Sequence, residues 1–158
     1  MSRCVESPRW LLLDCPFDGP EDLEEPHGRF VALKRLVGAL VPPSRTVWLV
    51  RSQDRPWWEP RLRHAGCHVI AQPFDRGSAV AVLMGALYIQ EHAPDAWVRV
   101  LGRSEAGASV AELLARFQKR APDMFASTQA LRSGRTLDEL YPFLPALDVD
   151  AVLGARVA

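Results

Sequence analysis

The segment Cys67-His68-Val69-Ile70-Ala71, followed by Gln72-Pro73-Phe74-Asp75-Arg76-Gly77-Ser78-Ala79, carries the main signal of the architecture. The first five residues form a short apolar run of the kind found in strands that are buried on both faces of a parallel sheet. Gly77 then opens an apolar helix that is expected to reach about His92. A buried strand, a loop and a glycine-started helix in this order are typical of α/β proteins.

The same alternation continues on both sides of this segment. Short apolar runs predict three further strands, at Arg9–Asp14, Thr46–Val50 and Trp97–Leu101. Helical spacing of apolar residues predicts helices over Phe30–Leu40 and Pro56–His64, with Gly66 capping the second. Alternating strands and helices form right-handed crossovers. We therefore predict an α/β fold: a three-layer, Rossmann-like, mainly parallel sheet.

The last third of the sequence has a different pattern. Apolar residues at helical spacing predict helices at Val110–Phe117, Asp123–Ser133 and Thr136–Leu144. We therefore divide the chain into an α/β core, residues 1–105, and a helical C-terminal part, residues 106–158, packed on that core.

Composition limits the classes of function. The chain has 158 residues, enough for one domain with a real core, and 19 basic residues balance 19 acidic ones. A net charge of zero gives no reason to expect nucleic acid or a membrane as partner. The three cysteines are an odd number, and no apolar run is long enough for a membrane span. We therefore expect reduced thiols and a cytoplasmic location.

The segment Gln72–Ala79 resembles the Gln-Pro-x-x-Arg-Gly-Thr-Ala stretch of bacterial mannose-1-phosphate guanylyltransferases, which are sugar-1-phosphate nucleotidyltransferases. Further segments resemble the same family, and together they cover roughly three quarters of the chain. These segments are Leu36–Val50, Arg55–Pro60, Ala93–Ala96, Ala121–Phe125, Leu137–Tyr141, Leu144–Pro145 and Asp148–Asp150. The resemblance implies the nucleotidyltransferase fold.

The resemblance also implies a nucleotide site. In the family, the positions that match Gln72, Pro73, Gly77 and Ser78 contact the base and the ribose of the nucleotide. An alternative interpretation is that Gly77 only makes a tight turn between strand and helix, and that Gln72 caps it.

The family's phosphate-binding loop has no counterpart in this sequence. The family places a glycine-rich loop with an Arg and a Lys after the first strand, whereas Asp14–Asp22 contains four acidic residues, one glycine and neither Arg nor Lys. Acidic side chains repel a triphosphate, and prolines provide no backbone donor.

The family's metal ligands are also replaced. Its metal-binding Asp corresponds to Ser104, which leaves Glu105 and Asp150 as the candidate metal ligands. From Glu105 the chain is expected to pass through Ala106-Gly107-Ala108 into the C-terminal helices, without the strands that carry the sugar site in the family. Loss of catalytic activity is the simplest explanation of these differences.

Two further groups of residues are considered as sites. Trp57 and Trp58 lie beside several arginines and are candidates for contact with a base or a protein partner. We favour the alternative in which one indole packs in the core and the other is partly exposed. His64, Cys67 and His68 are close in sequence, but a helix end and a strand start need not bring them together. We interpret them as structural.

The sequence therefore predicts a non-catalytic, nucleotidyltransferase-like protein that acts through protein–protein interaction or assembly. Loss of the family's central strands is expected to expose a sheet edge and apolar surface that a partner or a second copy covers. The alternatives are a sensor that binds a nucleotide or a nucleotide sugar, and residual guanylyltransferase activity. Only the last would require GTP and magnesium; no other cofactor is expected.

Overall fold

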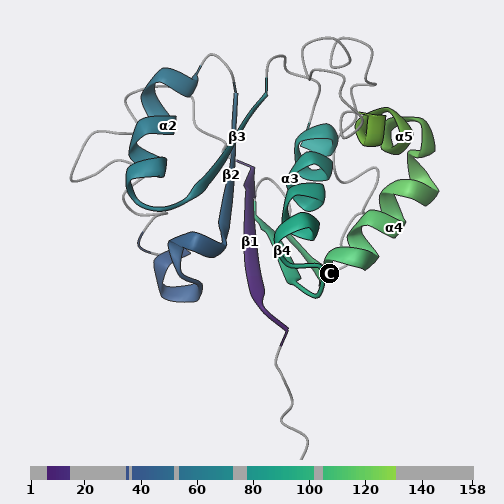
Figure 1. The fold of residues 1–158 in the computed structure, drawn as a ribbon, viewed down its shortest axis with the longest axis horizontal. Helices are drawn as coiled ribbons and strands as arrows, with labels where there is room; N and C mark the ends of the chain where they lie inside the picture. The colour runs from purple at the N-terminus through teal and green to yellow at the C-terminus, as the bar shows by residue number, and fades with distance from the viewer. Residues whose placement is uncertain are drawn as a thin grey trace, which may run out of the picture.

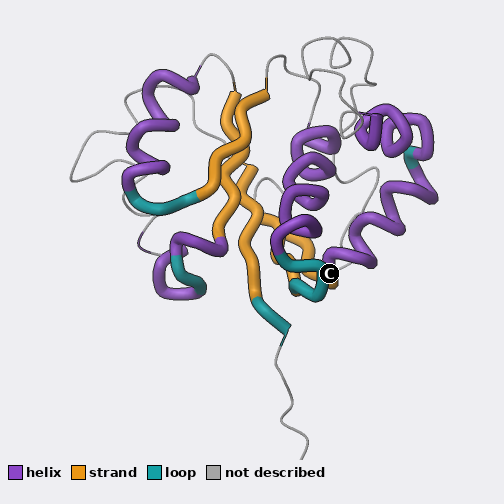
Figure 2. The backbone as a smooth tube through the Cα atoms, viewed as in Figure 1, coloured by secondary structure: helices purple, strands orange, loops and turns teal. Residues whose placement is uncertain are grey.

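The computed structural model of the chain describes residues 7–14, 35, 37–51, 54–72, 78–101 and 105–130. Its strands and helices alternate through most of this range (Figure 2). The strands are β1 (Arg9–Asp14), β2 (Thr46–Arg51), β3 (His68–Gln72), β4 (Trp97–Leu101) and β5 (Glu105–Ser109). The helices are η2 (Pro43–Arg45), α2 (Arg55–His64), α3 (Ser78–His92), α4 (Val110–Arg120) and α5 (Pro122–Ala130).

The strands form one sheet in the order β3-β2-β1-β4-β5. Parallel pairing joins β1 to both β2 and β4, and β2 to β3, whereas β5 runs antiparallel to β4. The central strand is therefore the first in sequence. The predicted mainly parallel α/β sheet is confirmed.

Helices cover both faces of the sheet and give three layers (Figure 1). On β1, Leu11 and Leu13 pack on one side with Trp58 and Leu62 of α2. Trp10 and Leu12 point to the other side, where α3, α4 and α5 pack. This alternation follows from the two-residue period of a strand, and it explains why these strands are apolar throughout.

Helix α3 approaches the sheet at Gly85. A Cβ atom added to this glycine would lie 2.3 Å from Leu12 Cδ1, and Leu12 is fully buried. The small residue therefore allows the helix backbone to pack directly on β1.

Helix α2 ends as the sequence predicts. Gly66 has a φ of +87°, its N–H donates to Arg63 O, and Cys67 N–H donates to Leu62 O, both at 3.0 Å. These two bonds form a Schellman motif, which favours glycine because of the positive φ. Pro56 lies in the first turn, where its lack of an N–H costs nothing.

The predicted path after Glu105 is wrong. Residues 105–109 form β5, a strand that was not predicted, whereas the first C-terminal helix begins at Val110 as predicted. The boundary proposed between residues 105 and 106 therefore falls inside a strand. The sequence Glu-Ala-Gly-Ala-Ser has no apolar alternation, so the strand depends on pairing with β4 rather than on its own propensity.

The C-terminal helices pack on α3 and extend the core. Val110, Leu113 and Phe117 of α4 and Met124 of α5 are fully buried in the cluster that includes α3. Ser109 caps α4 by accepting a hydrogen bond from Glu112 N–H at 3.2 Å. The predicted helix over Thr136–Leu144 lies outside the described residues, as does most of the one predicted over Phe30–Leu40, of which residues 35 and 37–40 are helical.

None of the described helices combines the length and the apolar character needed to cross a membrane.

Candidate functional site

The parallel strands all end at one edge of the sheet. β1 ends at Asp14, β2 at Arg51, β3 at Gln72 and β4 at Leu101. The chain moves outward from β1 to β3 and then returns through α3 to β4, so the strand order reverses between β1 and β4. In open α/β sheets, ligands bind outside the carboxyl ends of the strands at such a reversal. This edge is therefore the candidate site.

The segment predicted to bind nucleotide connects to this edge. Gln72 is the last residue of β3 and Ser78 the first of α3. Pro73 and Gly77 lie outside the described residues, as do the side chains of Gln72 and Ser78. The first turn of α3 continues into buried Ala79 and contains no acidic residue, so it presents no negative charge to a ligand there. A nucleotide contact at these four positions stays a prediction.

An ion pair at the end of β2 was not predicted from the sequence. Arg51 Nε donates to Asp54 Oδ2 at 2.7 Å, and Asp54 is nearly buried. The pair joins the last residue of β2 to the residue before α2. It therefore holds the start of α2 close to the end of β2. The Arg-x-x-Asp spacing at the strand-to-helix turn was the available signal.

The candidate metal ligands are not brought together by the described structure. Glu105 starts β5 rather than lying on a loop, and Asp150 lies outside the described residues. Within the described ranges, no three His, Cys, Asp or Glu residues gather where they would hold a metal ion.

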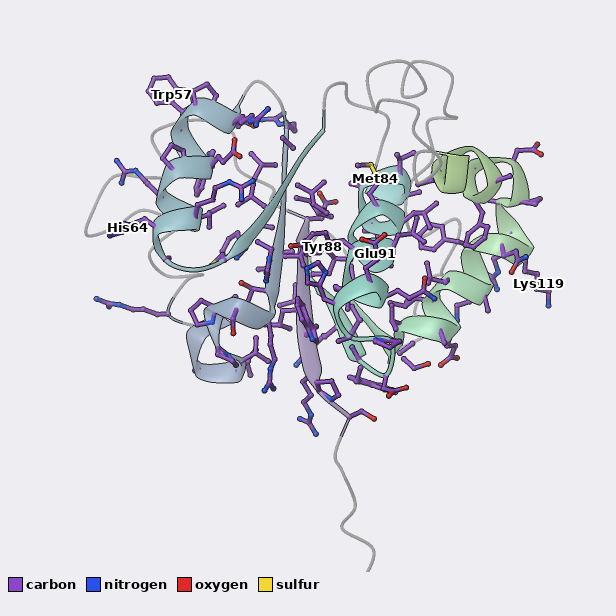
Figure 3. All side chains as sticks on the ribbon, in the orientation of Figure 1. Trp57, His64, Met84, Tyr88, Glu91 and Lys119 are labelled. Carbon is purple, nitrogen blue, oxygen red and sulfur yellow. The ribbon has the colours of Figure 1, made fainter. Side chains whose placement is uncertain are left out.

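The two adjacent tryptophans have different environments. Trp58 is 1% exposed and packs in the core beneath α2, whereas Trp57 is 49% exposed. Figure 3 shows Trp57 at the outer end of α2. Trp58 is therefore corrected from a candidate contact residue to a core residue, and Trp57 alone is available to a partner.

Glu59 forms ion pairs with two arginines on the same helix, α2. Glu59 accepts hydrogen bonds from Arg55 and from Arg63, the latter at 2.8 Å. Both hydrogen bonds lower the pKa of Glu59, the one from Arg55 more than the one from Arg63. The hydrogen bond to Glu59 in turn raises the pKa of Arg55. These residues stabilise an exposed helix face.

An aromatic cluster at the other end of β3 was not predicted. Tyr88 of α3 and His68 of β3 are joined by a 2.6 Å hydrogen bond between the hydroxyl and Nδ1, and His68 Nε2 lies 2.9 Å from Ser44 O. Because a carbonyl only accepts, Nε2 donates to Ser44 and Nδ1 accepts from Tyr88. Trp10 stacks on the His68 ring with centroids 5.6 Å apart. Burial raises the pKa of Tyr88.

This bonding gives both ring nitrogens of His68 a structural role. His64, by contrast, is exposed on α2, far from Tyr88 across the sheet (Figure 3). The hydrogen bonds of His68 agree with its interpretation as a structural residue, whereas the interpretation of His64 stays a prediction. The short apolar run around His68 gave no hint of Tyr88, which comes from a helix twenty residues later.

Comparison with known proteins finds one informative likeness. No protein-family profile and no curated protein sequence matches the chain. A crystal structure of mannose-1-phosphate geranyltransferase from Thermus thermophilus matches with a TM-score of 0.66, covering 94% of this chain and 70% of that chain at 16% sequence identity. At this identity the likeness concerns the fold. The chain therefore shares the α/β fold of that crystal structure.

Proposed function

We propose that the protein is a nucleotidyltransferase-like module that transfers no nucleotide and acts by associating with another protein chain. One observation carries this proposal: the segment that follows the central strand has the wrong charge for a triphosphate. Asp14 ends β1 at the edge where the strand order reverses, and Asp18, Glu21 and Asp22 follow within the next eight residues.

Nucleotidyl transfer depends on holding a triphosphate and neutralising its charge. Enzymes do this with backbone N–H groups, cations and a bound metal placed around the phosphates. The segment Asp14–Asp22 offers four carboxylates, two prolines and a single glycine, without Lys or Arg. Carboxylates at contact distance from phosphate oxygens oppose binding by Coulomb repulsion.

Exposed aromatic side chains support association with another chain as the role of the protein, in place of nucleotidyl transfer. Among the described residues, Leu40, Trp57 and Trp97 are large apolar side chains that are about half exposed. Tryptophan is enriched among residues that dominate binding energy at protein interfaces. A protein that retains this fold and these exposed side chains is suited to binding another chain.

The first test is a pyrophosphate-release assay with GTP, mannose-1-phosphate and magnesium. We expect release no faster than in a sample without protein, and an active guanylyltransferase in the same buffer serves as the positive control. Turnover that is lost on Glu105→Gln or Asp150→Asn would overturn the proposal in favour of residual transferase activity.

Nucleotide sensing is a second candidate because of the elements on either side of the segment predicted to bind nucleotide. Gln72 ends β3 at the carboxyl edge of the sheet, and Ser78 begins α3, so the segment is followed by a helix N-terminus. Calorimetric titration with GTP and with GDP-mannose tests it. Binding that is lost on Gln72→Ala and Ser78→Ala would support a sensor, and no heat with either ligand would exclude it.

A further inference from the structure

Strand β5 is the edge strand beside β4, the last in the order of the sheet. The backbone groups that it directs away from β4 can be identified. Trp97 N–H donates to Pro8 O on the β1 side of β4, and Val110 N–H donates to Ala96 O on the β5 side, both at 2.9 Å. Because backbone groups alternate between the two sides of a strand, Val98 and Val100 face β5.

The register then fixes the orientation of β5. Val98 pairs with Ala108 and Val100 with Ala106, so these two alanines direct their N–H and C=O groups to β4. Gly107, between them, directs its N–H and C=O groups to the outer side, as does Glu105. Among the residues that the structure describes, no strand pairs with this side.

The sequence of β5 does not protect this edge. Natural edge strands avoid pairing through prolines, lysines, bulges or inward-pointing charges. In Glu105-Ala106-Gly107-Ala108-Ser109 the single charge stands at the first position and no proline occurs. Small residues at the remaining positions allow another strand to approach closely.

An exposed tryptophan covers the centre of this edge. The indole of Trp97 is 47% exposed and lies over Gly107, where an added Cβ atom would be 3.6 Å from Nε1 and 3.8 Å from Cζ2. Val98 and Val100 point to the opposite face, into the core beneath α3. The face that carries Trp97 therefore offers aromatic surface beside backbone groups with which no described strand pairs.

We propose that β5 pairs antiparallel with β5 of a second copy, about a two-fold axis at Gly107. This inference rests on the proposed function, since it names the partner in the association. In this register Gly107 faces Gly107, Ala106 faces Ala108, and Glu105 faces Ser109, so like charges never stand opposite one another. The strand is thus complementary to itself, as a two-fold interface requires.

The same arrangement gives Trp97 a partner. Two glycines that exchange both backbone hydrogen bonds have Cα atoms about 5.5 Å apart. A two-fold axis perpendicular to the sheet keeps both indoles on one face, each above its own Gly107. The two rings then flank the axis and bury each other, while the two sheets become continuous.

Cross-linking tests the register directly. A Cα separation of about 5.5 Å lies within the range that a disulfide spans. Under mild oxidation we expect Gly107→Cys to form a covalent dimer on a non-reducing gel. Glu105→Cys serves as the matched control, because its two copies would stand about 14 Å apart, and the wild-type chain controls for its own cysteines. Equal cross-linking of both variants would overturn the register.

Sedimentation velocity across the micromolar range tests the association itself. We expect the wild-type chain of 17.6 kDa to sediment as a dimer. Gly107→Pro removes an N–H that points outward, whereas Gly107→Ala keeps it and adds a methyl at ordinary contact distance from Trp97. We expect the proline variant to be monomeric and the alanine variant to remain dimeric. Trp97→Ala, an exposed change, should weaken dimerisation at least tenfold.

The outcomes separate this inference from the proposed function. A monomeric wild-type chain, or a dimer that resists both Gly107→Pro and Trp97→Ala, overturns pairing through β5. A dimer that is lost on Trp57→Ala instead places the interface on α2; it overturns the β5 inference and leaves association as the function. Nucleotide turnover would overturn the proposed function, whatever the oligomeric state.

Discussion

At the scale of single residues, the lack of a side chain at Gly85 allows α3 to pack closely against Leu12 of β1. Gly85→Ala would place a methyl group against a fully buried Leu12 side chain. We expect this overpacking to lower the free energy of unfolding by about 1–3 kcal/mol, even though alanine is the better helix former.

Gly38→Ala is the matched control, because nothing lies within 4 Å of the added atom on that helical residue. Urea denaturation should show the control unchanged or stabilised by up to about 1 kcal/mol. Equal effects of the two substitutions would contradict the close approach of α3.

Tyr88 provides a second prediction at this scale. Tyr88→Phe leaves His68 Nδ1 without its donor, and we expect a loss of about 1–2 kcal/mol in unfolding free energy. Burial raises the pKa of Tyr88 above its ordinary 10.0, so folding favours the neutral hydroxyl. The stabilisation is therefore complete below pH 10.0 and is lost as the pH rises through the raised pKa.

Thermal unfolding of the wild-type chain and Tyr88→Phe at neutral and alkaline pH measures this effect. The difference between them should be largest at neutral pH and should narrow above the ordinary tyrosine pKa. A difference in unfolding free energy that is constant with pH would argue against a raised pKa of Tyr88 in the folded protein.

At the scale of elements, the salt bridges of α2 predict that the free energy of unfolding decreases at acidic pH. The arginines lower the pKa of Glu59 below its ordinary 4.5, so the stabilisation is present above that value and disappears as the pH falls through the lowered pKa. Glu59→Gln should cost less than about 1 kcal/mol at neutral pH, because exposed pairs contribute little.

Urea denaturation of both proteins at neutral and acidic pH checks this dependence. The two stabilities should converge at low pH, and added salt should reduce their difference at neutral pH. A difference that grows in acid would contradict the pairing.

The elements also show how far sequence reasoning reaches. Four strands and the ends of α2 could be predicted, because unbroken apolar runs and Gly66 leave local signals. β5 could not, since it is a strand only through its pairing with β4 and its own residues carry no strand pattern. Of the candidate site, only its position at the strand ends follows from the alternation of elements. The bond between His68 and Tyr88 joins side chains that meet only after folding, whereas the Arg51–Asp54 pair had its Arg-x-x-Asp spacing as a local signal.

At the scale of the whole molecule, the central position of β1 has a consequence for synthesis on the ribosome. β1 is made first, yet its second neighbour β4 begins only at Trp97. Until that residue leaves the exit tunnel, the side of β1 that pairs with β4 has no hydrogen-bonding partner. Non-local pairing of this kind exposes a nascent chain to wrong strand pairing, so we expect shielding of β1 until β4 has been translated to reduce misfolding.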